Sequence, residues 1–360
     1  MEKKPPKIQD VARAAGVSTA TVSRALSQPD MVAEATRQLV IDAVEKTGYR
    51  VNLAASNLRR RRTGTIVVMV PNLGNPFFST ILASIEAVAA PAGLGVLIVD
   101  TTQHQASRQQ VFAYLHRTRA DGLIVLDGSL AMELLEIGGE DSGMPPVVFA
   151  CEWSQDTTFP SVVIDNRYGA ELAIRHLHGL GHRRIGHVSG PVGNVLTQSR
   201  LQGSQDTLGT LGLEVRDDWF LSGDFSLQSG AEAAVEWLKL EERPTALFCS
   251  SDQMACGFIS ELNRRGYSVP RDMSIVGFDD IEIAVRFIPA LTTIRQPRGA
   301  IGAAAAEILI DRITRPAEAQ AITPRRVMDV ELVVRDSTAT PPGAKPAIRS
   351  ASEKLPNPAA

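Results

Sequence analysis

A short segment near the N-terminus carries residue types that can read DNA bases. In residues 8–26, IQDVARAAGVSTATVSRAL, a glycine separates two stretches with helical spacing. Arg24 can donate two hydrogen bonds to a guanine edge, and small polar neighbours can reach other base edges or phosphates. The outward face of the second stretch consists of one arginine and small, mostly polar residues, which suits a helix in the major groove of DNA. Its members are Thr19, Ala20, Ser23, Arg24 and Ser27.

Two short helices would have to hold that face in place. The first has an apolar stripe at Ile8, Val11, Ala12 and Ala15. Gly16 can adopt the left-handed conformation that a sharp turn requires. Ser18 stands at the N-cap of the second helix, with Val17 and Val22 placed for a hydrophobic staple. Any small helical hairpin has the same spacing, so this pattern alone leaves a role outside DNA binding open.

A third helix and a linker complete the N-terminal region. The helix is predicted over 33–47, with one stripe formed by Ala35, Leu39, Ala43 and Val44. Residues 1–50 would then form a three-helix DNA-binding domain. Residues 51–62 follow as a hinge whose helix is too short to be stable alone.

The charge of the chain divides at the same point. Residues 1–62 contain 12 Lys and Arg against 6 Asp and Glu, whereas the remaining 298 residues contain 25 against 34. The basic segment ends in four consecutive arginines, Arg59 to Arg62. A basic head on an acidic body is expected when only the head contacts a polyanion such as double-stranded DNA.

From residue 65 the pattern changes to apolar strands that alternate with helices. Strands are predicted at 65–70, 95–100, 122–127, 146–150, 161–165, 184–190, 245–251 and 273–280, and helices at 76–90, 105–118, 167–180, 198–212 and 252–265. Such alternation is typical of a parallel sheet covered on both faces. Because the rhythm restarts once, the fold class is α/β, with two doubly wound parallel-sheet subdomains.

We place the subdomain boundaries where the rhythm breaks. The first subdomain is expected over 63–160 plus 292–323, because residues 291–299 and the helix after them would cross back to it. The second is expected over 161–291 plus 324–336. The remainder, 337–360, is rich in Pro, Ala and Ser and is expected to be a disordered tail.

Composition and missing motifs narrow the function classes. No apolar run approaches the roughly 20 residues that span a bilayer, and the start MEKKPPK lacks the core of a secretory signal, so we expect a cytoplasmic protein. The cysteines, Cys151, Cys249 and Cys256, lack CxxC spacing, which favours reduced thiols. No GxGxxG at a strand-to-helix turn, GxxxxGK[ST] or GxSxG motif is present, so we expect no cofactor and no catalytic residues.

Several ordered motifs resemble the LacI/GalR family of bacterial transcription regulators. They lie at 7–26, 35–49, 71–86, 181–186, 200–203, 251–257, 269–280 and 291–302. Within the family, the strings VSTATVSRALSQPD, NPFFS and RQPRGAIG are most similar to repressors that respond to a nucleoside. The resemblance implies a helix-turn-helix head, a hinge and a body like a periplasmic binding protein. It also implies a homo-oligomer that binds operator DNA, and the lack of a terminal leucine heptad favours a dimer over a tetramer.

The resemblance assigns residues of the head and hinge to DNA. It places base contacts at Thr19, Ala20 and Arg24, with Ser18 and Ser23 as capping or phosphate-binding groups. It implies that the hinge becomes helical on the operator, where Leu58 enters the minor groove as a wedge between base steps. The hinge candidates are Asn52, Ala55, Leu58 and Arg59. The alternatives are a phosphate-only contact for Arg24 and an ordinary packed leucine for Leu58.

Two positions depart from the family pattern. Many relatives begin the first helix after a threonine cap, but Lys7 stands there, and Ala33 replaces the serine that often precedes the third helix. Each missing cap costs about 1 kcal/mol, which would make this head less stable.

The resemblance also implies a small effector between the two subdomains, where strand ends converge. The matching positions are Asn75, Phe77, Phe78, Cys151, Leu196, Arg200, Phe225, Ser251, Asp279 and Gln296. Arg200 and Asp279 can bond vicinal hydroxyls of a sugar or ribose, although a structural ion pair is the alternative for Arg200 and core packing for the phenylalanines. Cys151 stands where sugar- and purine-responsive relatives often carry aspartate. The adjacent Glu152 can supply that carboxylate, which favours a nucleoside as effector.

A metal-binding protein, a solute receptor and an enzyme are the alternatives to a repressor, and each predicts different sequence features. His176 and His178 are two residues apart on one predicted helix and point in different directions, so no metal site is expected from them or from His182 and His187. A solute receptor with the same body fold predicts a signal peptide and no helical head. An enzyme on a doubly wound fold predicts a convergent catalytic set.

Overall fold

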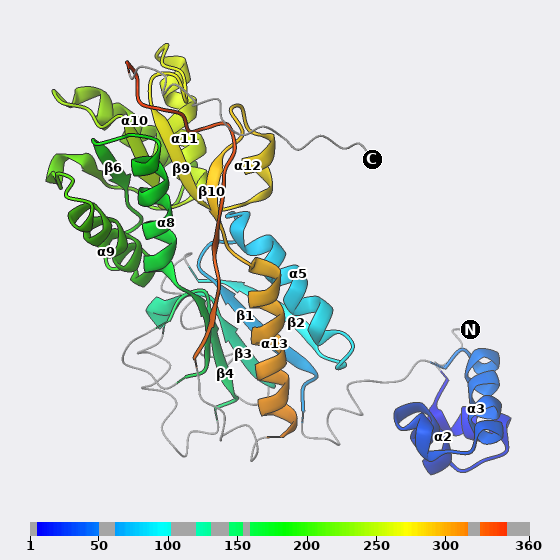
Figure 1. Ribbon diagram of the computed structural model, residues 1–360. Helices are drawn as coiled ribbons and strands as arrows, with labels where there is room; N and C mark the ends of the chain where they lie inside the picture. Colours follow the sequence, from blue (N-terminus) through cyan, green and yellow to red (C-terminus); the bar gives the residue numbers. More distant parts are fainter. Residues whose placement is uncertain are drawn as a thin grey trace, which may run out of the picture. The chain divides into compact units, whose positions relative to one another are not determined.

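The computed structural model describes residues 6–49, 62–101, 120–130, 144–153, 159–315 and 325–343. The chain divides into two compact units, residues 1–63 and 64–360. Figure 1 shows that the first is helical and that the second combines sheets with helices.

The first unit is a three-helix bundle. Its elements are α1 (Ile8–Ala15), α2 (Thr19–Ser27), the 3-10 turn η1 (Pro29–Met31) and α3 (Glu34–Thr47). Each helix contributes one fully buried valine: Val11, Val22 and Val40. Gly16 follows α1 with a φ of 67°, and Ser18 Oγ accepts a hydrogen bond from the Thr21 amide at 3.1 Å. The predicted turn and N-cap are therefore confirmed.

The third helix buries a different face from the predicted one. Val40 and Ala43 are buried, whereas Ala35 and Leu39 are exposed. The adjacent apolar residues 39 and 40 allow two stripes. Only the stripe through Val40 continues at the spacing of three, four and seven residues to Ala43, Val44 and Thr47, so packing selects it.

The two predicted cap defects are present in the bundle. Ala33 makes no side-chain cap hydrogen bond. At the start of α1, Asp10 accepts a hydrogen bond from the Lys7 backbone amide at 2.9 Å. This contact is one half of a capping box, and a lysine side chain cannot supply the other half because it has no acceptor.

The first sheet of the larger unit is entirely parallel, with strand order β11-β5-β4-β3-β1-β2. The strands are β1 (Thr65–Val70), β2 (Gly95–Asp100), β3 (Gly122–Val125), β4 (Val147–Ala150), β5 (Ser161–Ile164) and β11 (Arg325–Met328), and the 3-10 turn η2 (Gly128–Leu130) follows β3. Helices α5 (Phe77–Ala89) and α13 (Arg298–Thr314) lie side by side against this sheet (Figure 1). They approach so closely that a Cβ on Gly302 would lie 2.4 Å from the Ile81 carbonyl oxygen.

The second sheet has strand order β12-β10-β9-β8-β6-β7, and only β12 is antiparallel. The strands are β6 (Ile185–Val188), β7 (Phe220–Leu221), β8 (Ala246–Cys249), β9 (Ser274–Asp279), β10 (Thr292–Arg295) and β12 (Glu331–Val333). The helices are α8 (Asn166–Gly179), α9 (Val195–Thr210), η3 (Asp217–Trp219), α10 (Leu227–Lys239), α11 (Asp252–Arg264) and α12 (Glu282–Arg286). Within the described part of the chain, no helix is long and apolar enough to cross a bilayer.

Three of the expected subdomain boundaries fall on the wrong side of a strand. β5 belongs to the first sheet, so the chain crosses to the second sheet at Asp165 and not at residue 160. β10 stays beside β9, so the chain returns only at Gln296 and Pro297, after residue 292. Residues 324–336 are shared, because β11 pairs with β5 and β12 with β10. Each of these strands belongs to the sheet whose edge strand it pairs with through backbone hydrogen bonds. The apolar content of a strand does not reveal which edge that is.

The segment expected to begin a disordered tail is in part fixed. Ser337 is fully buried, where its hydroxyl donates to the Ile275 carbonyl at 2.6 Å and accepts from the Thr292 amide at 2.8 Å. The prediction for 337–360 is therefore wrong at its first residues, because they satisfy polar groups of β9 and β10. Residues 344–360 lie outside the described residues.

Candidate functional site

The outward face of α2 is in part arranged as its sequence predicts, and the exposure of Ser27 lies outside what the structure describes. Thr19, Ala20 and Arg24 are exposed, and Ser23 is half-buried. Among the described residues, Arg24 takes part in no ion pair, so its guanidinium is available to a ligand. Ser18 is occupied as the N-cap of α2, which fits the predicted capping role.

The hinge candidates Asn52, Ala55, Leu58 and Arg59 lie outside the described residues. Their assignment to DNA stays a prediction.

A cavity of about 250 Å³ lies in the larger unit, where the carboxyl ends of strands from both sheets meet. Ten of the residues expected at the effector site line it: Asn75, Phe77, Phe78, Cys151, Glu152, Leu196, Arg200, Phe225, Ser251 and Asp279. Gln296 lies one layer behind, where its Nε2 donates to Asp279 Oδ1 at 2.7 Å. The remaining lining residues, which the sequence did not single out, are Pro71, Asn72, Pro191, Asn194, Asp224 and Ser226.

Arg200 brings a buried positive charge to the cavity. Its Nε donates to Asn166 Oδ1 at 2.8 Å, and its Nη1 donates to the Ser250 carbonyl at 2.5 Å. The guanidinium also lies 3.7 Å from the centroid of the Phe278 ring. Burial lowers the pKa of Arg200 to about 10, so the group remains charged at neutral pH. No ion pair holds it within the described residues, which removes the structural ion pair considered as its alternative role.

Glu152 links the two sheets across the cavity. Its Oε1 accepts from Nδ2 of Asn194, the N-cap residue of α9, at 2.7 Å, and its Oε2 accepts from the Gly128 amide at 2.8 Å. Burial raises the pKa of Glu152 to about 7, although both hydrogen bonds favour the charged form. Asparagine is a favoured N-cap residue, but the sequence predicted this helix to begin at residue 198, whereas α9 begins at Val195, so Asn194 was not identified as its cap.

Asp279 stands at the end of β9 in a strained backbone conformation, with a φ of 121°. Burial raises its pKa to about 6, whereas Arg200 and the hydrogen bond from Gln296 oppose that rise. The carboxylate of Asp279 can therefore accept hydrogen bonds from a ligand above about pH 6. Ser251, which also lines the cavity, caps α11 by accepting from the Met254 amide at 3.2 Å.

The three phenylalanines at the cavity differ in how far they are buried in the hydrophobic core. Phe77 and Phe78 meet edge to face with ring centroids 5.0 Å apart, and both belong to the main hydrophobic core. Phe225 has a φ of 69° and is only half-buried, so more of its ring is left to face a ligand. It packs beside Leu196 and Trp153.

The cysteines of the larger unit are neutral thiols. All three are free and buried, and burial raises the pKa of the Cys151 thiol above its ordinary value. A neutral thiol is a poor nucleophile and a poor anionic acceptor. Cys151 therefore does not replace the carboxylate that the family often carries at this position, whereas Glu152 lies in the cavity and can.

Three of the described histidines, His176, His182 and His187, make contacts that stabilise the second sheet and its surroundings. His176 Nε2 lies 3.0 Å from Thr338 Oγ1, and His182 bonds Thr245 and Ser274. His187 is fully buried against the side chains of Ser204 and Ser250, and burial lowers its pKa to about 3. Among the residues that the structure describes, no group of three or more His, Cys, Asp or Glu side chains is placed to hold a metal ion.

Family models match both units. Residues 7–52 match the model of bacterial regulatory proteins of the lacI family, and residues 174–338 match the model of a periplasmic binding protein-like domain. The HTH-type transcriptional repressor CytR of Escherichia coli (strain K12) is 40% identical over 334 residues, which cover 92% of this chain and 96% of CytR.

Solved structures agree with the sequence relatives. The crystal structure of the Lac repressor dimer bound to operator and the anti-inducer ONPF has a TM-score of 0.79 at 30% identity, and the match covers 93% of this chain and 100% of the repressor. A LacI family transcriptional regulator from Enterococcus faecium with bound ribose has a TM-score of 0.69 at 28% identity, over 77% of this chain and 99% of its own. The chain therefore belongs to the LacI family of bacterial regulatory proteins, as a DNA-binding transcriptional repressor.

Proposed function

We propose that this repressor binds a nucleoside in its cavity and a near-palindromic operator through two copies of α2. The observation that carries the proposal is the cavity itself, which brings Arg200, Glu152 and Asp279 together where the strands of both sheets end. We further propose that the bound effector shifts the hinge between coil and helix, and so changes the affinity for operator DNA. The protein would act in the cytoplasm, where its operator lies.

The chemistry of the cavity supports a ribose-containing effector. Ribose hydroxyls can donate to the Asp279 carboxylate and accept from Arg200, whose Nη2 has no hydrogen bond within the described residues. The half-exposed Phe225 offers an apolar surface for a planar base. The cavity volume of about 250 Å³ lies just below the roughly 300–1,000 Å³ typical of small-molecule sites, which favours a small ligand such as a sugar or nucleoside. A free sugar is the second candidate, since the E. faecium relative holds ribose.

An unpartnered apolar surface supports a homodimer. Ile283 on α12 and Leu227 on α10 are half exposed, and both line a groove of about 630 Å³ in the larger unit. Leu97 and Ile98 are also exposed on β2, the edge strand of the first sheet. A contiguous exposed apolar surface is typical of an interaction site, and we propose the groove that contains Ile283 and Leu227 as such a site. The Lac repressor, which is matched over its whole length, is a dimer bound to its operator, so a second copy of this chain is the partner that we propose.

The effector is tested by thermal unfolding with adenosine, cytidine, guanosine, uridine and ribose. We expect one nucleoside to raise the melting temperature by several degrees at about 100 times its Kd. Arg200→Ala should abolish the rise, because the variant loses a donor to the ribose hydroxyls. Arg200→Lys keeps the charge and serves as the control. Stabilisation that persists undiminished in both variants would remove Arg200 from the site.

Glu152 gives the stability a characteristic pH dependence. Its pKa of about 7 lies above the ordinary carboxylate value, so the folded state binds the proton more tightly than the unfolded state. The cost of the buried charge is therefore present above pH 7 and is relieved as the pH falls toward 5. We expect the free energy of unfolding of the unmodified chain, relative to Glu152→Gln, to rise by roughly 1–3 kcal/mol between pH 8 and pH 5.5. Urea titrations at both pH values measure it, and a difference that does not change with pH contradicts it.

Arg24 is expected to read a base. A duplex selected from a random pool by the unmodified chain supplies the specific site. Arg24→Ala should weaken binding to this duplex by about 10- to 100-fold, as expected for a lost bidentate contact, and should weaken binding to a scrambled duplex much less. Arg13→Ala is the matched control, because Arg13 is an exposed arginine on α1. Equal losses on both duplexes would leave Arg24 as a phosphate contact.

The dimer is tested on the apolar groove. Ile283→Asp places a charge at its centre and should raise the fraction of monomer, because desolvating an unpaired carboxylate is costly. Val215→Asp is the control, since Val215 is an exposed valine outside the groove. Sedimentation equilibrium of the full chain measures both variants. A monomer in the unmodified protein, or a dimer unaffected by Ile283→Asp, rules out this surface.

A further inference from the structure

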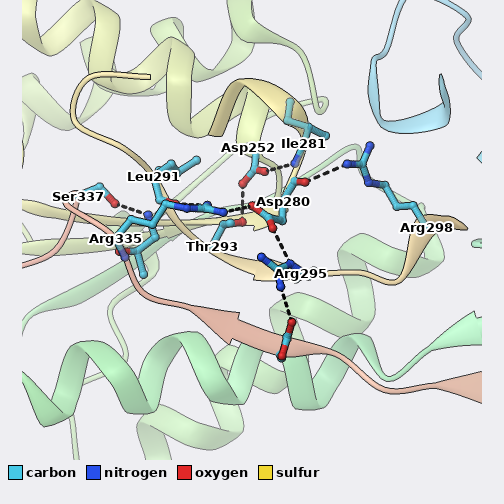
Figure 2. A network of polar contacts seen from close by, with 11 residues as sticks. Asp252, Asp280, Ile281, Leu291, Thr293, Arg295, Arg298, Arg335 and Ser337 are labelled. Atoms are coloured by element: carbon cyan, nitrogen blue, oxygen red, sulfur yellow. Dashed lines mark hydrogen bonds and ion pairs between the residues drawn. The ribbon is translucent and has the colours of Figure 1, made fainter. Parts of the chain in front are cut away.

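A network of charged groups surrounds Asp280 and Ile281 (Figure 2), in the turn that begins with Asp279. Asp279 lines the cavity, and both aspartates have positive φ values, 121° and 52°. Such a conformation is unfavourable for an aspartate unless the surroundings hold it. The contacts that hold this turn therefore also determine where the Asp279 carboxylate lies.

Most of these contacts come from the second sheet. Arg335 donates to Asp280 Oδ1 at 2.6 Å, and Arg295 donates to Asp280 Oδ2 at 2.7 Å. The Ile281 amide donates to the buried Asp252 carboxylate at 2.9 Å. These groups fix the turn to its own sheet.

Arg298 differs because its two terminal nitrogens reach both walls. Its Nη2 donates to the Asp280 carbonyl at 2.9 Å, and its Nη1 donates to the Phe77 carbonyl at 3.4 Å. Phe77 begins α5 and lines the cavity from the side of the first sheet. Arg298 itself begins α13, which packs tightly on α5 at Gly302 and therefore belongs to the side of the first sheet.

We propose that Arg298 is a positioning residue that fixes the spacing between the two walls of the effector cavity. It joins the first turn of α5 to the turn at the end of β9 without touching the effector. The inference rests on the proposed function, because it concerns the same cavity. It adds a specific element that couples the two sheets. A guanidinium presents its N–H donors in a rigid planar fork that can hold two carbonyl groups at fixed positions, whereas a lysine ammonium is a compact charge on a flexible stem and lacks that geometry.

Two arginines of the same network make a matched pair for the test. Arg298→Met removes the hydrogen bonds by which this residue joins the two walls. Arg295→Met removes a contact to the same Asp280 but leaves it bonded to Arg335, and both partners of Arg295 belong to the second sheet. Arg298→Lys restores the charge and one hydrogen bond.

The first measurement is amide hydrogen exchange on the full chain without effector. In Arg298→Met, peptides that contain 77–80 and 279–281 should both exchange several-fold faster, whereas Arg295→Met should leave 77–80 unchanged. The second is the Kd for the nucleoside that stabilises the unmodified chain. We expect about a 10-fold rise in Arg298→Met, an intermediate value in Arg298→Lys and a smaller change in Arg295→Met.

The outcomes separate the inference from the proposed function. If the unmodified chain binds none of the four nucleosides or ribose, the proposed effector is wrong, and the exchange data still decide whether Arg298 joins the two walls. Unchanged exchange in Arg298→Met, faster exchange in only one of the two segments, or equal losses of affinity in Arg298→Met and Arg295→Met would each overturn the positioning role.

Discussion

The architecture of the body depends on a chain that passes between two sheets three times. The first crossing is at Asp165, the second at Gln296 and Pro297, and the third between β11 and β12. Because the sheets share their connections, neither can be completed independently of the other. The first two crossings also place polar residues against the cavity: Asn166 bonds Arg200, and Gln296 bonds Asp279. The same segments that join the sheets thus orient the groups proposed to bind the effector.

The cavity keeps charged groups buried without pairing them directly. Arg200 is held by an amide oxygen, a carbonyl oxygen and an aromatic ring, and Glu152 by two N–H donors. Buried charges of this kind are costly, and the raised pKa values of Glu152 and Asp279 express that cost. A ligand rich in hydroxyl groups can recover part of it by supplying the missing donors and acceptors. The arrangement is therefore suited to binding, and the family relationship identifies the protein as a regulator.

The parts of the structure that follow from local spacing could be predicted from the sequence. The turn at Gly16 and the cap at Ser18 depend on residues within one helical turn, and both are observed. The cavity residues lie far apart in the chain and were predicted only through the family resemblance, since no periodicity brings Phe77, Arg200 and Asp279 together.

The predictions that were wrong concern choices made by tertiary packing. Leu39 and Val40 are neighbours of similar hydrophobicity, so only contact with α1 and α2 decides which one is buried. β5 and β10 are apolar strands like their neighbours, and edge pairing assigns each to its sheet. The region between 213 and 244, where no element was predicted, contains β7 and α10. Asn194 was missed because its partner, Glu152, is 42 residues away in the chain.

The fixed segment after β12 bears on how the protein is made. Ser337 and Ala339 bond the Ser274, Ile275 and Thr292 groups of β9 and β10, and the Ala339 carbonyl also lies 2.9 Å from His182 Nε2. The three-helix head has no such dependence and can fold as soon as it leaves the ribosome, because its contacts are local. The second sheet must wait until nearly the whole chain has been translated. During synthesis, a nascent polypeptide can therefore carry a finished DNA-binding head well before it carries a finished sensor.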